Sequence, residues 1–157
     1  MWIGNRSRTD RILAAVEILA MGLWLGALCG FAFIQAPSAF AIVGQTDVVR
    51  FAALTAANLH ALALLGSICG AIAIVITLVR SRTAGERTFD FVRALLVVIA
   101  LGLVWFEMAT IVPAMARIAD LHSAEYHALH TRSSIVYGGV VLLAAVVLVM
   151  AAIRRDT

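Results

Sequence analysis

Four long apolar runs, separated by short connections that hold most of the arginines, constrain this chain more than any other feature. A helix needs about 20 apolar residues to cross a hydrocarbon core of about 30 Å. The runs that reach this length are 12–34, 54–79, 94–112 and 134–153. They are continuous rather than alternating, which favours helices over a membrane β-barrel. We therefore predict an all-α integral membrane protein, with a single transmembrane domain (1–157) forming a four-helix bundle.

The composition excludes several other classes of protein. Hydrophobic residues make up 63% of the chain and charged residues 13%, with a mean hydropathy of +1.02. Soluble domains carry about 25% charged residues, so this polar surface is too small to cover a water-soluble core. A chain this rich in apolar residues and this poor in charged ones is also neither disordered nor a nucleic-acid-binding module. With only Cys29 and Cys69, the chain is no disulfide scaffold, and their different expected depths in the membrane predict two unpaired, inert thiols.

The connections are short, so neighbouring helices are expected to pack antiparallel in an up-down-up-down bundle. Nine of the 12 arginines then lie on the side of the termini: 6, 8, 11, 80, 82, 87, 93, 154 and 155. The other side holds Arg50, Arg117 and Arg132. The positive-inside rule places both termini in the cytoplasm of an inner (plasma) membrane. The first run is too long for a signal peptide, so we expect it to be retained as a span.

The connection at 113–132 is amphipathic. Its apolar residues recur at near-helical spacing against charged ones: Met115, Ile118, Leu121 and Leu129 against Arg117, Asp120 and Glu125. This pattern is typical of a helix that lies on the membrane surface. We therefore expect an amphipathic external segment between spans three and four.

Glycines are expected to bring helices into close contact, because lipid gives helices no hydrophobic reason to associate. Gly22, Gly26 and Gly30 form one stripe on the first span, and Gly66 and Gly70 form another on the second. Helix–helix seams are the main interpretation, with a substrate groove as the alternative. The stripes would also serve a homo-oligomer or another membrane protein.

Ionisable residues inside a span cost free energy, so each is a candidate for function. Glu17 lies near the cytoplasmic end of the first span, where it would reach the interface or pair with Arg11 or a loop arginine. His60 and Glu107 share a depth of about 10 Å below the outer surface. Asn58 and Tyr137 reach the same layer, and His130 lies above it. A structural His60–Glu107 pair and a ligand-binding or proton-relay site remain alternative interpretations.

The histidines of the third connection form a second candidate site. His127 and His130 lie on one helical face, with His122 two turns before His130. Imidazoles beside carboxylates bind copper or zinc, whereas histidines at a membrane surface are the simpler interpretation. The sequence has no HExxH motif, P-loop, dinucleotide fingerprint or haem-attachment motif.

Four short motifs occur along the chain in an order similar to that found in a known family. They are Gly22-Leu23-Trp24-Leu25-Gly26, then Ala36-Pro37-Ser38-Ala39-Phe40, then Ile111-Val112-Pro113-Ala114-Met115, and finally Tyr126, Leu129, His130 and Ser133. Together they resemble the transmembrane-protein-205-like family (domain of unknown function 4149), which implies a four-span fold and no established reaction. A weaker likeness to copper-resistance D-type membrane domains and to the four-span protoporphyrinogen oxidase implies histidine-bound copper or haem. The chain has no lysine, whereas the oxidase couples a lysine to its histidine.

Three hypotheses for function follow. The first is a non-enzymatic membrane protein that binds or conducts a small ligand or ion through a polar pocket open to the outer side. The second is a membrane redox protein or metal carrier that holds haem or copper at His60 with His127 or His130. The third is a structural partner in a membrane complex, with the glycine stripes as its interface.

Overall fold

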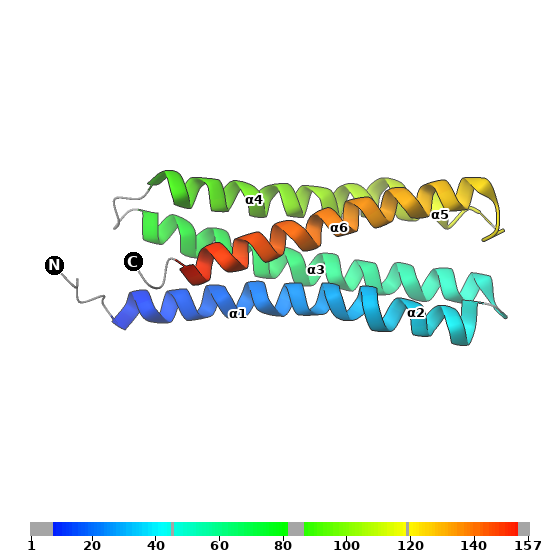
Figure 1. The fold of residues 1–157 in the computed structure, drawn as a ribbon, viewed down its shortest axis with the longest axis horizontal. Coiled ribbons are helices and arrows are strands. Elements are labelled where there is room, and N and C mark those ends of the chain that lie inside the picture. The colour runs from blue at the N-terminus through cyan, green and yellow to red at the C-terminus, as the bar shows by residue number, and fades with distance from the viewer. Residues whose placement is uncertain (1–7, 45, 82–86, 119, 154–157) are drawn as a thin grey trace.

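The computed structural model describes residues 8–44, 46–81, 87–118 and 120–153, and these residues form four long helical rods (Figure 1). The first rod joins α1 (Arg8–Gly30), η1 (Phe31–Gln35), α2 (Ala36–Ala39) and η2 (Phe40–Gly44). The second rod is α3 (Val48–Ser81). The third joins α4 (Arg87–Phe106), η3 (Glu107–Ile111) and α5 (Val112–Met115), and the fourth is α6 (Ala124–Ile153).

The rods pack as a square bundle. α1 packs against α3 and α6, and α4 packs against the same two helices, so α1 and α4 face each other across a diagonal. The first turn of α1 and the last turn of α6 lie at the same end (Figure 1). All four rods are long and apolar enough to cross a membrane. The predicted all-α, up-down-up-down bundle is confirmed, and the chain is a multi-pass membrane protein.

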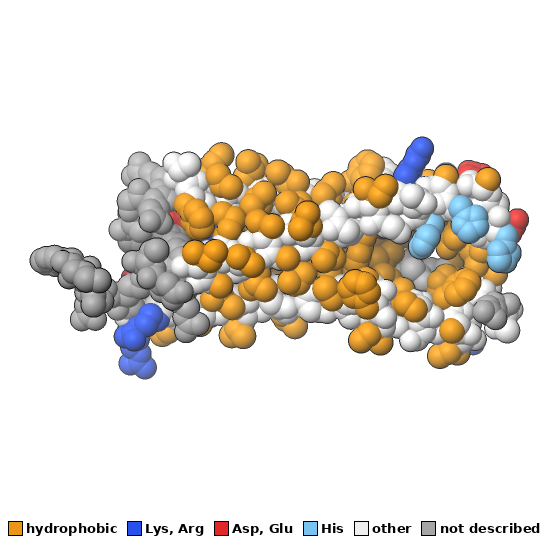
Figure 2. Space-filling view, in the orientation of Figure 1, with side chains coloured by type: hydrophobic (Ala, Val, Ile, Leu, Met, Phe, Trp, Pro, Cys, Tyr) orange, Lys and Arg blue, Asp and Glu red, His pale blue; other side chains and the backbone are white. Residues whose placement is uncertain are grey.

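Apolar side chains cover the outside of the bundle as well as its inside. Figure 2 shows them along the middle of the visible face, with charged and histidine side chains gathered towards the ends. Leu19 is 71% exposed and Ile68 61% exposed, and both lie within spans, where the outside of the bundle faces lipid. The inside instead contains a few bulky side chains, such as Trp24, Met21 and Leu28, packed among alanines and valines.

The glycine stripe of α1 does not form a helix–helix seam within the bundle. A Cβ added at Gly22, Gly26 or Gly30 meets no atom within 4 Å. The reason is that α1 turns its bulky face inward, with Trp24 and Leu28 wholly buried, and the glycines fall on nearly the opposite side. The predicted seam is therefore wrong for this stripe, and a partner that binds there stays a prediction.

The glycines of α3 do lie in seams, as expected. A Cβ at Gly66 would lie 2.5 Å from Nε1 of Trp24, and a Cβ at Gly70 would lie 2.9 Å from Cδ1 of Leu101. Gly66 thus receives the indole ring of α1, and Gly70 receives a leucine of α4. Small residues on α3 accept large residues from both neighbours, in agreement with packing that depends on close contact rather than on hydrophobicity.

Each proline follows a π-helical segment. Pro37 comes after η1 and Pro113 after η3, where the N–H of Ala36 donates to the carbonyl of Phe31 and that of Val112 to Glu107. Proline has no N–H and its ring clashes with the carbonyl four residues earlier. A π-helical segment supplies an extra residue that absorbs this clash, and such segments are frequent at functional sites. η3 begins at Glu107, so this local distortion sets the position of a buried carboxylate.

The connection between the third and fourth rods differs from the expected surface helix. Residues up to Met115 extend the third rod, and α6 begins at Ala124. Ser123 caps α6, because its hydroxyl accepts a hydrogen bond from the N–H of Tyr126 at 3.2 Å. The amphipathic pattern therefore belongs to the ends of two long helices and the turns that join them, and Ala119 lies outside the described residues.

Candidate functional site

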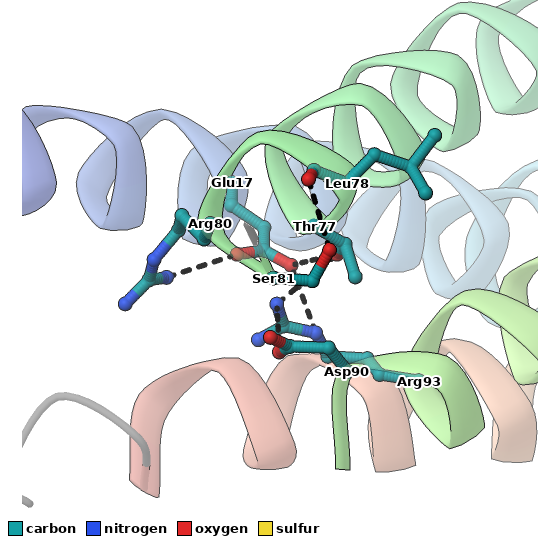
Figure 3. A network of polar contacts seen from close by, with 7 residues as sticks. All are labelled: Glu17, Thr77, Leu78, Arg80, Ser81, Asp90 and Arg93. Atoms are coloured by element: carbon teal, nitrogen blue, oxygen red, sulfur yellow. Dashed lines mark hydrogen bonds and ion pairs between the residues drawn. The ribbon is translucent and has the colours of Figure 1, made fainter. Parts of the chain in front are cut away.

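Two polar centres lie inside the bundle, near its opposite ends. At the end that holds the first turn of α1, a buried group of side chains joins three helices (Figure 3). We name this group the arginine–glutamate cluster; it consists of Glu17 from α1, Thr77 and Arg80 from α3, and Asp90 and Arg93 from α4. The second centre surrounds Glu107 and lies near the other end.

In the arginine–glutamate cluster, one carboxylate receives two guanidinium groups. Nε of Arg93 lies 3.2 Å from Oε1 of Glu17, and Nη1 of Arg80 lies 3.5 Å from Oε2. Thr77 accepts a hydrogen bond from Nη2 of Arg93 at 3.0 Å and donates one to Glu17 at 3.4 Å. Asp90 approaches the same Nη2 at 3.4 Å. The hypothesis that Glu17 pairs with an arginine of a connection is confirmed by Arg80 and Arg93, which the structure places in the last turn of α3 and in α4. Arg11 is exposed.

These charges are deeply buried. The side chains of Glu17 and Arg93 are completely inaccessible, that of Asp90 is 1% exposed and that of Arg80 6% exposed. Ions in such a setting require partners, because removing one member leaves an uncompensated charge. Thr77, Asp90 and Arg93 were not among the site residues predicted from the sequence. The signal was present, since a carboxylate inside the first span needs a cation and Arg80 and Arg93 adjoin the next two spans.

The second centre is built around Glu107, the first residue of η3. This side chain is buried and accepts a hydrogen bond from the hydroxyl of Ser133 on α6. Beside it lies a cavity of about 10 Å³ that is bounded by Glu107, Tyr137 and apolar side chains of α1, α3 and α4. The hydroxyl of Tyr137 donates to the carbonyl of Leu28 at 3.2 Å. Of the residues predicted for this layer, Glu107 and Tyr137 border the same cavity, and Ser133 joins them through its hydrogen bond to Glu107.

His60 does not join this centre. Its side chain is exposed, and its ring lies edge-on against Trp105 with the centroids 6.5 Å apart. Among the described residues, no hydrogen bond or ion pair connects His60 to Glu107, so the expected pair is absent. The cause is rotation about the α3 axis, which turns Leu59, Leu62 and Ala63 toward the cavity instead. Asn58 is half-buried and is not among the residues that line the cavity.

The histidines of the third connection are exposed on and before the first turns of α6. The ring of Tyr126 stacks on His130 with a centroid separation of 6.1 Å and lies edge-on to His127 at 6.3 Å. No group of three or more His, Cys, Asp or Glu side chains suited to a metal ion occurs in the part of the chain that the structure describes. His127 and His130 therefore share a face, as predicted, without a third ligand from among these residues.

Fold and polar centres together define a four-span helical membrane protein with two separate buried polar centres. No family model, curated protein or solved structure matches the chain. The likeness to the transmembrane-protein-205-like family therefore stays a prediction from the sequence motifs.

Proposed function

We propose that this chain is an inner-membrane protein whose pocket around Glu107 binds one small monovalent cation of the size of sodium. The observation that carries the proposal is a buried carboxylate without a cationic partner among the described residues. A carboxylate in a low-dielectric interior needs a compensating charge or a proton. Its counterpart Glu17, at the other end of the bundle, has two arginines.

The groups around Glu107 have the chemistry that hard cations prefer, which is oxygen. The Glu107 carboxylate and the Ser133 hydroxyl are hydrogen-bonded to each other, and Tyr137 places its ring at the same cavity. A cavity of about 10 Å³ admits about one water-sized particle. One carboxylate balances one positive charge, which favours a monovalent ion over a divalent one.

The position of Ser133 along α6 supports access from one side of the membrane. From Ser133 to Ile153 the helix carries no charged residue. At about 1.5 Å per residue this stretch is about 30 Å long, which equals the thickness of a hydrocarbon core. Ser133 and its partner Glu107 then lie at one edge of the core. The arginine bias places the termini in the cytoplasm, so the pocket opens to the outer side.

Binding is favoured over conduction by the residues between the two polar centres. The middle of the bundle is filled by Met21, Trp24, Val97 and Val140, all at most 1% exposed. An ion that moved from Glu107 towards the arginine–glutamate cluster would leave its oxygen ligands in this apolar region, at a cost of several kcal/mol. The pocket therefore ends inside the bundle.

The test is the thermal stability of the detergent-purified protein in sodium chloride and in choline chloride at equal ionic strength. A ligand that binds only the folded state raises its stability as the ligand concentration rises. We expect sodium to raise the melting temperature of the wild type and of Glu125→Gln, an exposed control on α6. Glu107→Gln should lose this dependence. A wild type that responds equally to both salts would contradict the proposal.

A further inference from the structure

A groove separate from the Glu107 pocket runs between η3 and α6 on the outside of the bundle. Its volume is about 440 Å³, and its walls are mainly apolar, with Phe106, Ile111, Leu129, Ile135 and Val136 among them. Ile135 is 70% exposed and Phe106 53% exposed, so the groove opens towards lipid rather than into the bundle. Walls of this kind exclude water and accept hydrocarbon.

Arg132 is the one charged residue that lines this groove. Its side chain is exposed, and it forms no ion pair with any of the described residues. From Arg132 to Ile153 is 21 residues, or about 32 Å of helix, compared with about 30 Å of hydrocarbon. The guanidinium therefore lies at the depth of lipid headgroups, and the inner part of the groove, at Phe106, Ile135 and Val136, lies at the edge of the acyl-chain region.

We propose that the groove binds one acyl chain of an anionic phospholipid of the phosphatidylglycerol class, with Arg132 holding the phosphodiester. A guanidinium matches phosphate oxygens with two parallel N–H donors. The volume falls within the range of small-molecule sites, about 300–1,000 Å³. A single unpaired positive charge is neutralised by a lipid of net charge −1. A zwitterionic lipid brings its own cation to the same place and gains less from the arginine.

The experiment is native mass spectrometry of the delipidated full-length protein in detergent, with phosphatidylglycerol or phosphatidylcholine added. We expect a single-lipid adduct that forms at lower concentrations of phosphatidylglycerol than of phosphatidylcholine. R132Q should weaken the phosphatidylglycerol adduct about ten-fold, the loss that follows from removing one charged hydrogen bond. R132K should weaken it less, because lysine keeps the charge.

Two further variants separate the groove from general surface charge. R117Q removes another exposed arginine, one that does not line the groove, and should leave the adduct unchanged. I135W places a larger side chain at the groove and should weaken the adducts of both lipids. Equal binding of the two lipids to the wild type, or an equal loss in R117Q and R132Q, would overturn the proposal.

Discussion

Glu17 and Arg93 form an ion pair across the diagonal of the bundle, with Nε of Arg93 3.2 Å from Oε1 of Glu17. Their helices, α1 and α4, both pack on α3 and α6 rather than mainly on each other. Both side chains are completely buried. The pair therefore links two helices that the apolar packing leaves apart, and Arg80 and Thr77 attach the third helix, α3, to the same carboxylate.

Removing either member of this pair should strongly destabilise the protein. The buried cluster holds two arginines and two carboxylates, so Glu17→Ala or Arg93→Ala leaves it with one uncompensated charge, which costs about 3–5 kcal/mol. The double variant should lose less than the sum of the two single losses, because they act on one interaction. Denaturant unfolding in detergent measures the three values. Arg11→Ala, on the exposed side of α1, is the control; strictly additive losses would show that the two side chains are not coupled.

Gly66 of α3 and Gly26 of α1, one from each glycine stripe, should differ in their response to a larger side chain. Gly66→Leu drives a side chain into the indole of Trp24, where even a Cβ would lie 2.5 Å from Nε1. Overpacking of this kind costs about 1–3 kcal/mol. Gly26→Leu points into open space and should leave the melting temperature unchanged in dilute detergent. A loss of stability in Gly26→Leu would indicate that the α1 stripe contacts another protein.

Adjacent serines on α6 should also differ. Ser133 donates to the buried carboxylate of Glu107, whereas Ser134 donates to the carbonyl of His130 in its own helix at 2.9 Å. Ser133→Ala leaves Glu107 without this donor and should cost about 1–3 kcal/mol. Ser134→Ala should be nearly neutral. Equal melting temperatures for the two variants would show that the Ser133–Glu107 bond contributes nothing to stability.

The arginine distribution predicts the orientation of the bundle. With nine arginines expected on the side of the termini and three on the other, the positive-inside rule predicts that both termini lie in the cytoplasm. Alkaline phosphatase fused after Thr157 should be inactive, and the same enzyme fused after Asp120, between α5 and α6, should be active. Reversed activities at the two positions would show that the bundle is inserted the other way round.

The fold was predictable because hydropathy alone delimits helices that cross a membrane. The four predicted runs lie within the four rods, and the helices continue beyond them where polar residues enter the interface. The inward face of α1 was not predictable from the same signal. Leu19, which faces lipid, and Leu28, which is 1% exposed, are chemically alike. When both environments are apolar, the periodicity of hydrophobic residues carries little information about which face is buried.

The candidate site was predictable in depth but not in its contacts. Counting residues placed Glu107 and Tyr137 in one layer, and the structure has both at the same small cavity. Counting also placed His60 there, but depth does not specify rotation about the helix axis, and His60 lies beside Trp105 instead. The partners of Glu17 lie 63 and 76 residues further along the chain, and only the arrangement of the helices shows which arginines reach it.

The ion pairs of Glu17 also set an order of events during biosynthesis. The chain emerges N-terminal end first, so α1 is synthesised before either of its arginine partners. A lone carboxylate in a helix at that depth opposes release into lipid. Arg80 arrives with the end of α3 and Arg93 with the start of α4. Glu17 thus gains its first arginine when the second helix is complete, and Arg93 joins it, together with Asp90, when the third begins.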